Sequence, residues 1–279
     1  MNAKGDLTKF LEEQTEADGH AALSGAKTRS LAIVGHVVEI RDEDDLVAVG
    51  VVATHLQPDG STHWSVETVV ARSMRFPAFE DITLDKAIDL VPRDASMSVW
   101  SRRRSLDDAL ARAGHTCLRS LAFMTVPLPL TLTTDLVVDT FASGDEDRLL
   151  AINQATFGTH REAGALDAAE LETLMSERWF DPEGILFHQI GGADAAFCWT
   201  KVHEGGFGEI YRIGVAPQFQ GRGIGKEIVV AGYRHLHNKR GAETGTLWVD
   251  ESNRAAVGLY ETLGLRVEER NREFSRPSG

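Results

Sequence analysis

The chain of 279 residues has little cysteine and no long apolar run. Its two cysteines, Cys117 and Cys198, lie in apolar, strand-like stretches, so we expect buried core residues rather than a disulfide or a metal pair. No run of about 18 apolar residues is available to cross a membrane, and the first residues, Met1–Asp6, lack the apolar core of a secretory signal. These absences predict a soluble, cytoplasmic protein without a metal cofactor.

Positive charge is also scarce. The 29 lysines and arginines stand against 42 acidic residues, which gives a net charge of −13. Such a balance argues against nucleic acid or an anionic membrane as a main partner. A phosphorylated ligand would therefore have to be held by local donors, such as loop amides, Arg222 and Lys226.

The length and the 42% apolar content suffice for two domains, each with its own core. The segment Val126-Pro-Leu-Pro-Leu130 carries two prolines in an extended context, which favours a stiff connector. We therefore predict one domain over residues 1–128 and a second over residues 131–279. In the first, patterning predicts helices at 7–17, 81–91 and 105–113, and strands at 31–40, 46–54, 64–71, 97–100 and 117–126.

The second domain is predicted to have two capped helices, one started by a capping box at Ser143-Gly-Asp-Glu146 and one by Asp167. Strands are expected at 135–141, 185–190, 195–203, 246–250 and 265–270, and further helices at 226–237 and 253–263. In the first domain, the acidic run Arg41–Asp45 is expected to be a solvated hairpin tip.

The most informative stretch, Glu209–Lys226, reads as a strand, a turn and a glycine-rich loop that opens into a helix. The odd-numbered residues from Glu209 to Val215 are expected on one face, and Gly214 to interrupt the strand. The loop Gln220-Gly-Arg-Gly-Ile-Gly225 offers backbone N–H groups at a helix N-terminus, which favours an anion. Its spacing fits neither a dinucleotide-binding loop nor a P-loop, and a tight turn without a ligand is the alternative.

The two halves end alike, which indicates an internal duplication. The segment Trp100–Gly114 with its following strand parallels Trp248–Gly264 with its own, each with a glycine after the helix. Four residues before that glycine stands Leu110 in the first half and Tyr260 in the second. Where the loop would recur, Arg72–Phe79 contains no glycine. The first half thus lacks both the tyrosine and the loop glycines, which favours chemistry confined to the second half.

Transfer of an acyl group from a thioester to an amine needs a base for the amine, a donor for the oxyanion and an acid for the thiolate. Glu209 is a candidate base, the backbone N–H of Ile213 a candidate oxyanion donor if the strand splays at Gly214, and Tyr260 a candidate acid. The alternatives are a strand-end salt bridge for Glu209 and a core aromatic role for Tyr260.

The pattern Gln-x-x-Gly-x-Gly after an interrupted strand resembles the acetyl-CoA pyrophosphate loop of the GNAT acyltransferases. Several segments further resemble the mycothiol synthase family: Trp199-Thr-Lys-Val-His203, Gly208-Glu-Ile-Tyr211, Gln220-Gly-Arg-Gly-Ile-Gly225, Ser252-Asn-Arg-Ala-Ala-Val257, Trp179-Phe-Asp-Pro182 and Ala17-Asp-Gly19. The resemblance spans the chain and is stronger from about residue 135 onward. It implies an α/β (α+β) fold of two tandem GNAT-like domains, each a mixed, mostly antiparallel sheet flanked by helices.

The resemblance also implies transfer of acetyl from acetyl-CoA to the cysteinyl amine of cysteinyl-glucosaminyl-inositol, with Glu209 as general base and Tyr260 as general acid. It assigns acetyl-CoA to Ile213, Gly214, Val215, Gln220, Gly221, Arg222, Gly223, Ile224, Gly225, Lys226, Asn253, Arg254, Ala255, Ala256, Val257 and Gly258. It assigns the sugar substrate to Asp18, Glu162, Lys201, Glu209 and Trp248. Carboxylates suit a polyol that carries an ammonium, because they accept hydrogen bonds from both.

Two features depart from the family pattern. Trp248 stands where a tyrosine is expected, so an indole N–H replaces a hydroxyl. The first-half loop lacks the glycines that let this domain hold acetyl-CoA in the family, so we expect it to bind acetyl-CoA poorly and to wall the substrate cleft through Asp18. The alternatives are an N-acetyltransferase for another amine, such as an aminoglycoside or a protein N-terminus, and a CoA-sensing module without turnover. A tandem pair favours a monomer.

Overall fold

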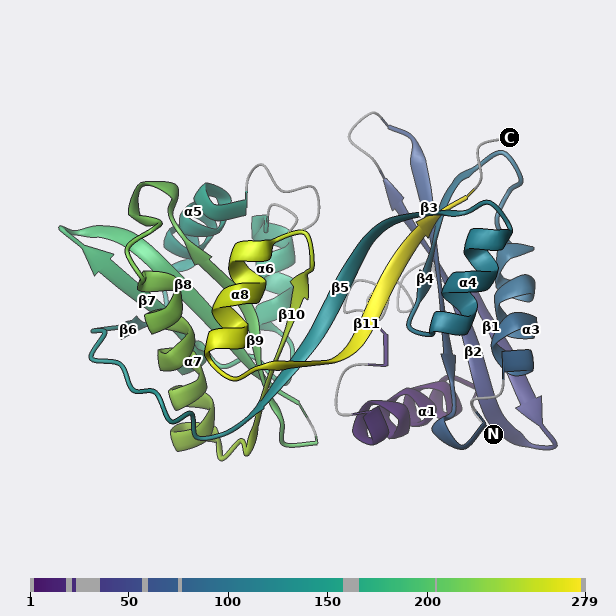
Figure 1. The fold of residues 1–279 in the computed structure, drawn as a ribbon, viewed down its shortest axis with the longest axis horizontal. Helices are drawn as coiled ribbons and strands as arrows, with labels where there is room; N and C mark the ends of the chain where they lie inside the picture. The colour runs from purple at the N-terminus through teal and green to yellow at the C-terminus, as the bar shows by residue number, and fades with distance from the viewer. Residues whose placement is uncertain are drawn as a thin grey trace. The chain divides into compact units, whose positions relative to one another are not determined.

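The computed structural model describes residues 3–18, 22–23, 36–56, 60–74, 77–157, 166–203 and 205–276. The chain forms two compact units, in each of which helices flank a sheet (Figure 1). The first unit comprises Met1–Ala122, Asp250–Ser252 and Glu269–Gly279, and the second comprises Phe123–Val249 and Asn253–Glu268. These units therefore divide the chain at other places than the predicted domain limits, because the C-terminal strand returns to the first unit.

The first unit is a sheet with strand order β1-β2-β3-β4-β11-β5. Its elements are α1 Ala3–Asp18, β1 His36–Asp42, β2 Asp45–Leu56, β3 Thr62–Val70, the 3-10 helix η1 Arg72–Met74, α3 Pro77–Ile88, β4 Ser96–Ser101, α4 Arg104–Arg112 and β5 Thr116–Pro127. Strands β3 and β4 are parallel, whereas β1–β2, β2–β3 and β4–β11 are antiparallel. The acidic hairpin tip is confirmed, since Asp42 pairs with Asp45 and Glu43 adopts a φ of 51°.

The second unit has the strand order β5-β10-β9-β8-β7-β6. Its elements are β6 Asp139–Thr140, α5 Glu146–Phe157, α6 Ala168–Met175, η2 Pro182–Gly184, β7 Ile185–Ile190, β8 Ala193–Val202, β9 Gly208–Val215, η3 Pro217–Phe219, α7 Ile224–Arg240, β10 Thr244–Asp250, α8 Arg254–Thr262 and β11 Arg266–Ser275, which continues into the first unit. The pairs β6–β7, β7–β8 and β8–β9 are antiparallel, whereas β9–β10 is parallel. The prediction of mixed, mostly antiparallel sheets is confirmed.

Helices cover both faces of the second sheet. On one face, Leu149 and Ile152 of α5 and Leu171 and Leu174 of α6 pack against Trp199 and other buried strand residues. On the other face, α7 approaches so closely that a Cβ on Gly232 would meet Cys198 Sγ at 2.6 Å. No helix in the described parts of the chain combines the length and apolarity needed to cross a membrane.

The matching ends of the two halves are confirmed. Gly114 and Gly264 both have positive φ, 87° and 91°, and each follows the C-cap residue of α4 or α8. The next residue in each case donates its N–H to the carbonyl of Leu110 or Tyr260, over 3.0 and 3.1 Å. Leu110 and Tyr260 thus occupy equivalent positions of the same helix-ending motif.

The sequence predictions for Cys117, for residues 135–141 and for Ser143 are wrong. Cys117 is exposed, although Cys198 is buried as expected. The strand predicted at 135–141 shrinks to β6, because this edge strand pairs with β7 at only two positions. Ser143 does not cap α5: Gly144 turns the chain with a φ of 99°, so that Asp145 precedes the helix and accepts the N–H of Ala142. The cap at Asp167 is confirmed by its bond from the N–H of Glu170.

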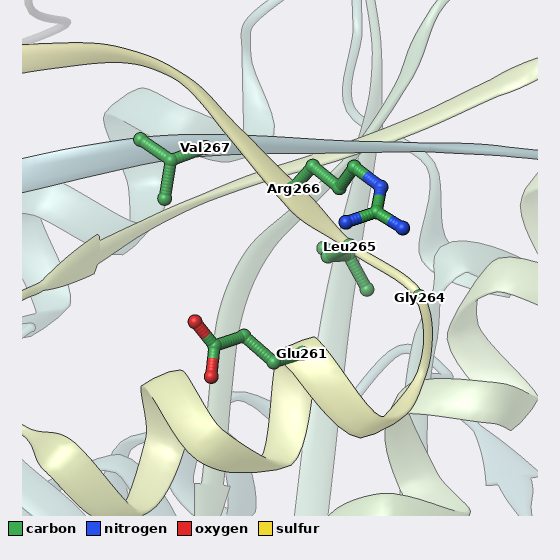
Figure 2. A pocket seen from close by; sticks show the side chains of 5 residues that line it. All are labelled: Glu261, Gly264, Leu265, Arg266 and Val267. Atoms are coloured by element: carbon green, nitrogen blue, oxygen red, sulfur yellow. The ribbon is translucent and has the colours of Figure 1, made fainter.

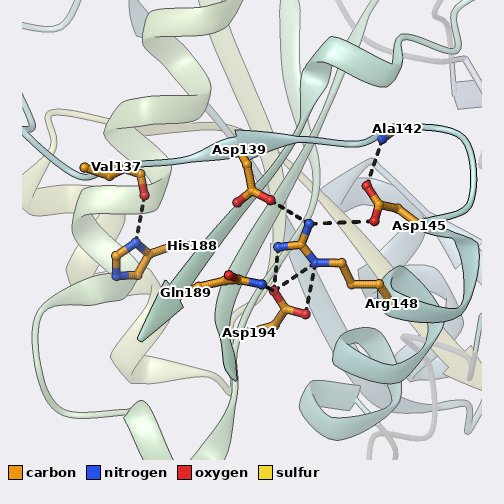
Figure 3. Close-up of polar contacts among 8 residues, drawn as sticks. All are labelled: Val137, Asp139, Ala142, Asp145, Arg148, His188, Gln189 and Asp194. Carbon is orange, nitrogen blue, oxygen red and sulfur yellow. Dashed lines mark hydrogen bonds and ion pairs between the residues drawn. The ribbon is translucent and has the colours of Figure 1, made fainter. Parts of the chain in front are cut away.

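An ion-pair cluster around Arg148 ties the sheet edge to α5 (Figure 3). The guanidinium makes hydrogen bonds of 2.6–3.0 Å to Asp194 and one of 2.6 Å to Asp139, and it lies 4.0 Å from the Phe187 ring centroid. Burial alone would raise the pKa of Asp194, but hydrogen bonds from Arg148 and Gln189 and the charge of Arg148 outweigh it and lower that pKa. The cluster joins α5, β6 and the β7–β8 hairpin.

Replacing Arg148 with glutamine is expected to lower the free energy of unfolding by about 2 kcal/mol, because the Asp194 carboxylate loses its charged donor. A carboxylate with a lowered pKa stabilises the fold above its unfolded pKa of about 4 and ceases to do so as the pH falls through its folded pKa. The deficit of R148Q, measured by urea denaturation, should therefore be full at pH 7 and shrink near pH 3.

The matched control is K9Q, which breaks the exposed Lys9–Glu13 pair and should change the free energy of unfolding by less than about 0.5 kcal/mol. An R148Q variant as stable as wild type at pH 7 would contradict a stabilising role for the cluster.

Candidate active site

The parallel strands β9 and β10 separate early. They pair at only three positions, from Gly208–Gly245 to Ile210–Leu247, whereas β9 stays paired with β8 as far as Val215. The predicted break in the strand is therefore present, but it lies after Ile210 and on the β10 side. At Gly214 itself, β9 is still paired with Phe197 of β8, so the strand separates from β10 alone.

The separation leaves a row of backbone groups facing away from β8. The N–H of Ala216 donates to the carbonyl of Ala195 over 2.9 Å. Because hydrogen-bonded and non-hydrogen-bonded pairs alternate along an antiparallel ladder, Gly214 turns its backbone groups toward β8, and Ile213 and Val215 turn theirs the other way. The N–H groups of Ile213 and Val215 thus point to the side that β10 has left.

A β-bulge in β9 redistributes its side chains. Trp199 pairs with Arg212 and Thr200 pairs with Ile210, so Tyr211 is the extra residue. The expectation that Glu209, Tyr211, Ile213 and Val215 share one face is therefore wrong. Tyr211 packs against Trp179 and Trp199 on the α5–α6 face, with ring centroids 5.1 and 5.5 Å away.

Beyond the bulge, Ile213 lies directly opposite Cys198, which faces α7. Glu209, in contrast, precedes Ile210, whose side chain approaches Gly232 of α7, so Glu209 points to the α5–α6 face. The bulge thus lets one strand present a carboxylate on one face and apolar side chains on the other.

Gly214 has a packing role in addition to its place in the strand. A Cβ on this residue would come within 2.3 Å of Thr156 Cγ2 and 2.8 Å of Thr156 Cβ on α5. Any side chain at Gly214 would therefore push α5 away from β9.

The glycine-rich loop ends in an open helix N-terminus. Gly221 and Gly223 have φ values of 73° and 81°, which favour glycine, and a Cβ on either would meet no described atom within 4 Å. Gly223 is the N-cap of α7 and so supplies no side-chain cap to its first N–H groups. Gln220 fastens the loop to the strand, since its Nε2 donates to the Val215 carbonyl over 3.0 Å.

Three predicted binding segments converge at the start of α7. A Cβ on Gly225 would lie 3.4 Å from Leu259 of α8 and 3.6 Å from Val215 of β9. Asn253 caps α8 by accepting the N–H of Ala256 over 3.1 Å. The structure therefore brings the end of β9, the loop and the first turns of α8 together.

Among the described residues, the ionic partner of Glu209 is a histidine and not a lysine or arginine. Its Oε2 lies 2.6 Å from Nε2 of His203, and the two side chains are 13% and 8% exposed. Lys201 pairs with Glu209 across the β8–β9 ladder and places its Nζ 4.6 Å from the Trp179 ring centroid. The sequence reasoning missed the contact with His203; the signal was its position two residues after Lys201, just beyond the end of β8.

Tyr260 lies inside the second unit, only 7% exposed. Burial, with a smaller contribution from nearby Cys198, raises its pKa to about 12, so it is a neutral phenol at physiological pH. Burial also raises the pKa of Tyr233 well above its ordinary value, with further contributions from Tyr260, Cys198 and Glu209. Tyr260 and Tyr233 are thus both buried phenols influenced by Cys198.

Other predicted substrate residues are less informative. Trp248 packs on Phe123 with ring centroids 5.0 Å apart. The side chain of Asp18 and all of Glu162 lie outside the described residues. A separate hollow of about 260 Å³ lies beside the turn from α8 to β11. It is lined by Glu261, Gly264, Leu265, Arg266 and Val267, which are drawn in Figure 2. None of these is a predicted site residue.

Comparisons with known proteins agree with this architecture. The profile of the Acetyltransferase (GNAT) family matches residues 149–265. A mycothiol acetyltransferase of Renibacterium salmoninarum is 30% identical over 301 aligned positions, which cover 98% of this chain and 87% of the relative. The chain belongs to the mycothiol acetyltransferase family of the GNAT acetyltransferases.

Other similar proteins match either part of the chain or most of it. A mycothiol acetyltransferase of Streptomyces bingchenggensis is 41% identical over 167 residues, and this match spans 56% of the chain and only 54% of the relative. In the first such matches the chain thus spans about half the length of the curated relatives. A solved tandem GNAT protein from the clavulanic acid pathway, 13% identical, aligns with a TM-score of 0.63 over 88% of this chain and 85% of its own. It supports the tandem fold.

The pKa of Tyr260 can be checked by spectrophotometric titration. The chain has three tyrosines, so the difference in phenolate absorbance between wild type and Y260F isolates this side chain. We expect the difference to appear only near pH 12, because burial disfavours the phenolate. A difference that develops near pH 10 would show Tyr260 to be solvated.

Proposed function

We propose that the chain is an acetyl-CoA-dependent N-acetyltransferase that acetylates the cysteinyl amine of cysteinyl-glucosaminyl-inositol to form mycothiol. The observation that carries the proposal is the early separation of β10 from β9 beside the uncapped N-terminus of α7. The names of the relatives support the choice of substrate.

The residues of the second unit fit acetyl-CoA. The outward N–H groups of Ile213 and Val215 can pair with an amide-rich ligand laid along β9, in the place of a strand. The N–H groups at the start of α7, with Arg222 and Lys226 beside them, suit a pyrophosphate. The start of α8 from Asn253 to Gly258 adjoins this region through Leu259. Acetyl-CoA, when bound, supplies an activated acetyl group as a thioester.

The proposed chemistry uses three groups of this chain. Glu209 accepts the proton of the substrate amine, either directly or through a water, so that the nitrogen lone pair can attack the thioester carbon. The Ile213 N–H donates to the oxyanion that forms there. Tyr260 donates its phenolic proton to the sulfur as the C–S bond breaks. The acetylated nitrogen releases its remaining extra proton to solvent, and exchange with solvent then reprotonates Tyr260 and deprotonates Glu209. A phenol with a raised pKa is still protonated when the thiolate leaves.

The substrate is proposed to bind on the α5–α6 face, where Glu209 and Lys201 are neighbours. Asp18, Glu162 and Trp248 complete the set by resemblance to the family. The bound acetyl-CoA is proposed to be confined to the second domain, because Leu110, buried in the first core, replaces the tyrosine and Arg72–Phe79 lacks loop glycines. We keep residues 1–128 and 131–279 as proposed domains, and a monomer as the proposed active form.

Two substitutions test the proposal in an assay that follows release of the CoA thiol. With cysteinyl-glucosaminyl-inositol, E209Q should lower kcat/KM about 100- to 10,000-fold, because the amine loses its base, and Y260F about 10- to 100-fold. Both variants should retain affinity for acetyl-CoA by calorimetry. An unchanged rate for Y260F would discard the general acid.

The same assay with an aminoglycoside and with simple amines decides the acceptor. Faster turnover of any of these would replace the proposed substrate. Binding of acetyl-CoA without transfer to any acceptor would instead favour a CoA-sensing module.

A further inference from the structure

His203 contacts Glu209 but is not one of the three groups proposed to carry out the chemistry. We propose that His203 is a positioning residue that holds one oxygen of the Glu209 carboxylate and so directs the other oxygen to the amine. This inference rests on the proposed role of Glu209 as the general base.

The distance itself indicates a strong, oriented hydrogen bond. His203 Nε2 and Glu209 Oε2 are 2.6 Å apart, and both side chains are largely shielded from water. A carboxylate can only accept hydrogen bonds, so a deprotonated Glu209 requires the proton on Nε2 of His203. Charge-assisted bonds of this length are about twice as strong as neutral ones. Oε2 is therefore engaged by His203, and no hydrogen bond from a described residue to Oε1 is found, which leaves Oε1 for the substrate.

The imidazole is itself held from two sides. Its ring stacks on Phe207 with centroids 4.3 Å apart and an interplanar angle of 13°. The backbone N–H of His203 donates to the Phe207 carbonyl over 3.1 Å, and the Gly206 N–H donates to the His203 carbonyl over 2.9 Å. The turn between β8 and β9 thus fixes the ring, and the ring fixes the carboxylate at the start of β9.

The position of Glu209 on β9 explains why its carboxylate needs a hydrogen-bond donor such as His203. Glu209 lies at the last stretch of β9 that is paired on both sides, just before the bulge at Tyr211 and the loss of β10. Its ladder neighbour Lys201 points its Nζ over the Trp179 ring, 4.6 Å from the centroid. Without His203, a carboxylate between these features has several rotamers open to it. A base misplaced by about 1 Å can lose about 100-fold in rate.

The test compares H203L, which removes the donor, with H203Q, which keeps an N–H donor on a side chain of similar reach. H203L should lower kcat about 10- to 100-fold with the KM for acetyl-CoA within about twofold of wild type, and H203Q should recover most of that loss. The matched control is H188L, because His188 also makes a hydrogen bond, to the Val137 carbonyl, but at β7, and its loss should leave kcat unchanged (Figure 3).

A double-mutant comparison separates positioning from a general packing role. In an E209Q background, H203L should add less than about twofold, because its effect acts through the carboxylate. Wild-type kcat in H203L, or a further tenfold loss when it is added to E209Q, would overturn the proposal. If E209Q alone retains full activity, the general-base assignment fails first, and the positioning role fails with it.

Thermal unfolding tests the same bond without an acceptor substrate. The melting temperatures of wild type, H203L, E209L and the double variant should show coupling between the two positions, since each single change breaks the same bond. Additive shifts would contradict the bond in solution and with it the proposal.

Discussion

The early end of the ladder between β9 and β10 is the constraint on which the site depends. A parallel pair that continued past Ile210 would consume the outward backbone groups of Ile213 and Val215 in sheet hydrogen bonds. Because the pair ends at Leu247, those groups lie beside the start of α7, where Gly223 leaves the helix without a side-chain cap. The unpaired edge of β9 and the uncapped start of α7 thus form one surface, which suits a ligand that contains amides and phosphates.

The bulge at Tyr211 adds chemistry to that surface. It separates Glu209, which faces α5 and α6, from Ile213, which faces α7, within five residues of one strand. The base and the backbone that would hold the thioester are thereby supplied by the same strand without competing for one face. The His203–Glu209 bond then orients the base, and Tyr260, on α8, is a buried phenol influenced by Cys198.

Sequence reasoning found the elements that local patterns encode. The glycines at 114 and 264, the Asp167 cap and the acidic hairpin tip follow from side-chain chemistry within a few residues, and the structure confirms them. It could not find the bulge at Tyr211 or the early departure of β10, because both are set by which residues of another strand lie opposite. Ser143 failed as a cap because Gly144 turns the chain first. The contact of His203 with Glu209 likewise depends on the turn through Phe207.

The central claim is that acetyl-CoA binds where β9 and β10 separate, and only there. Amide hydrogen exchange with and without acetyl-CoA tests it most directly. The account predicts slower exchange at Ile213, Val215 and the loop from Gly221 to Lys226, with no change at Arg72–Phe79. Unchanged exchange along β9 and the loop, or protection that appears in the first half, would contradict it.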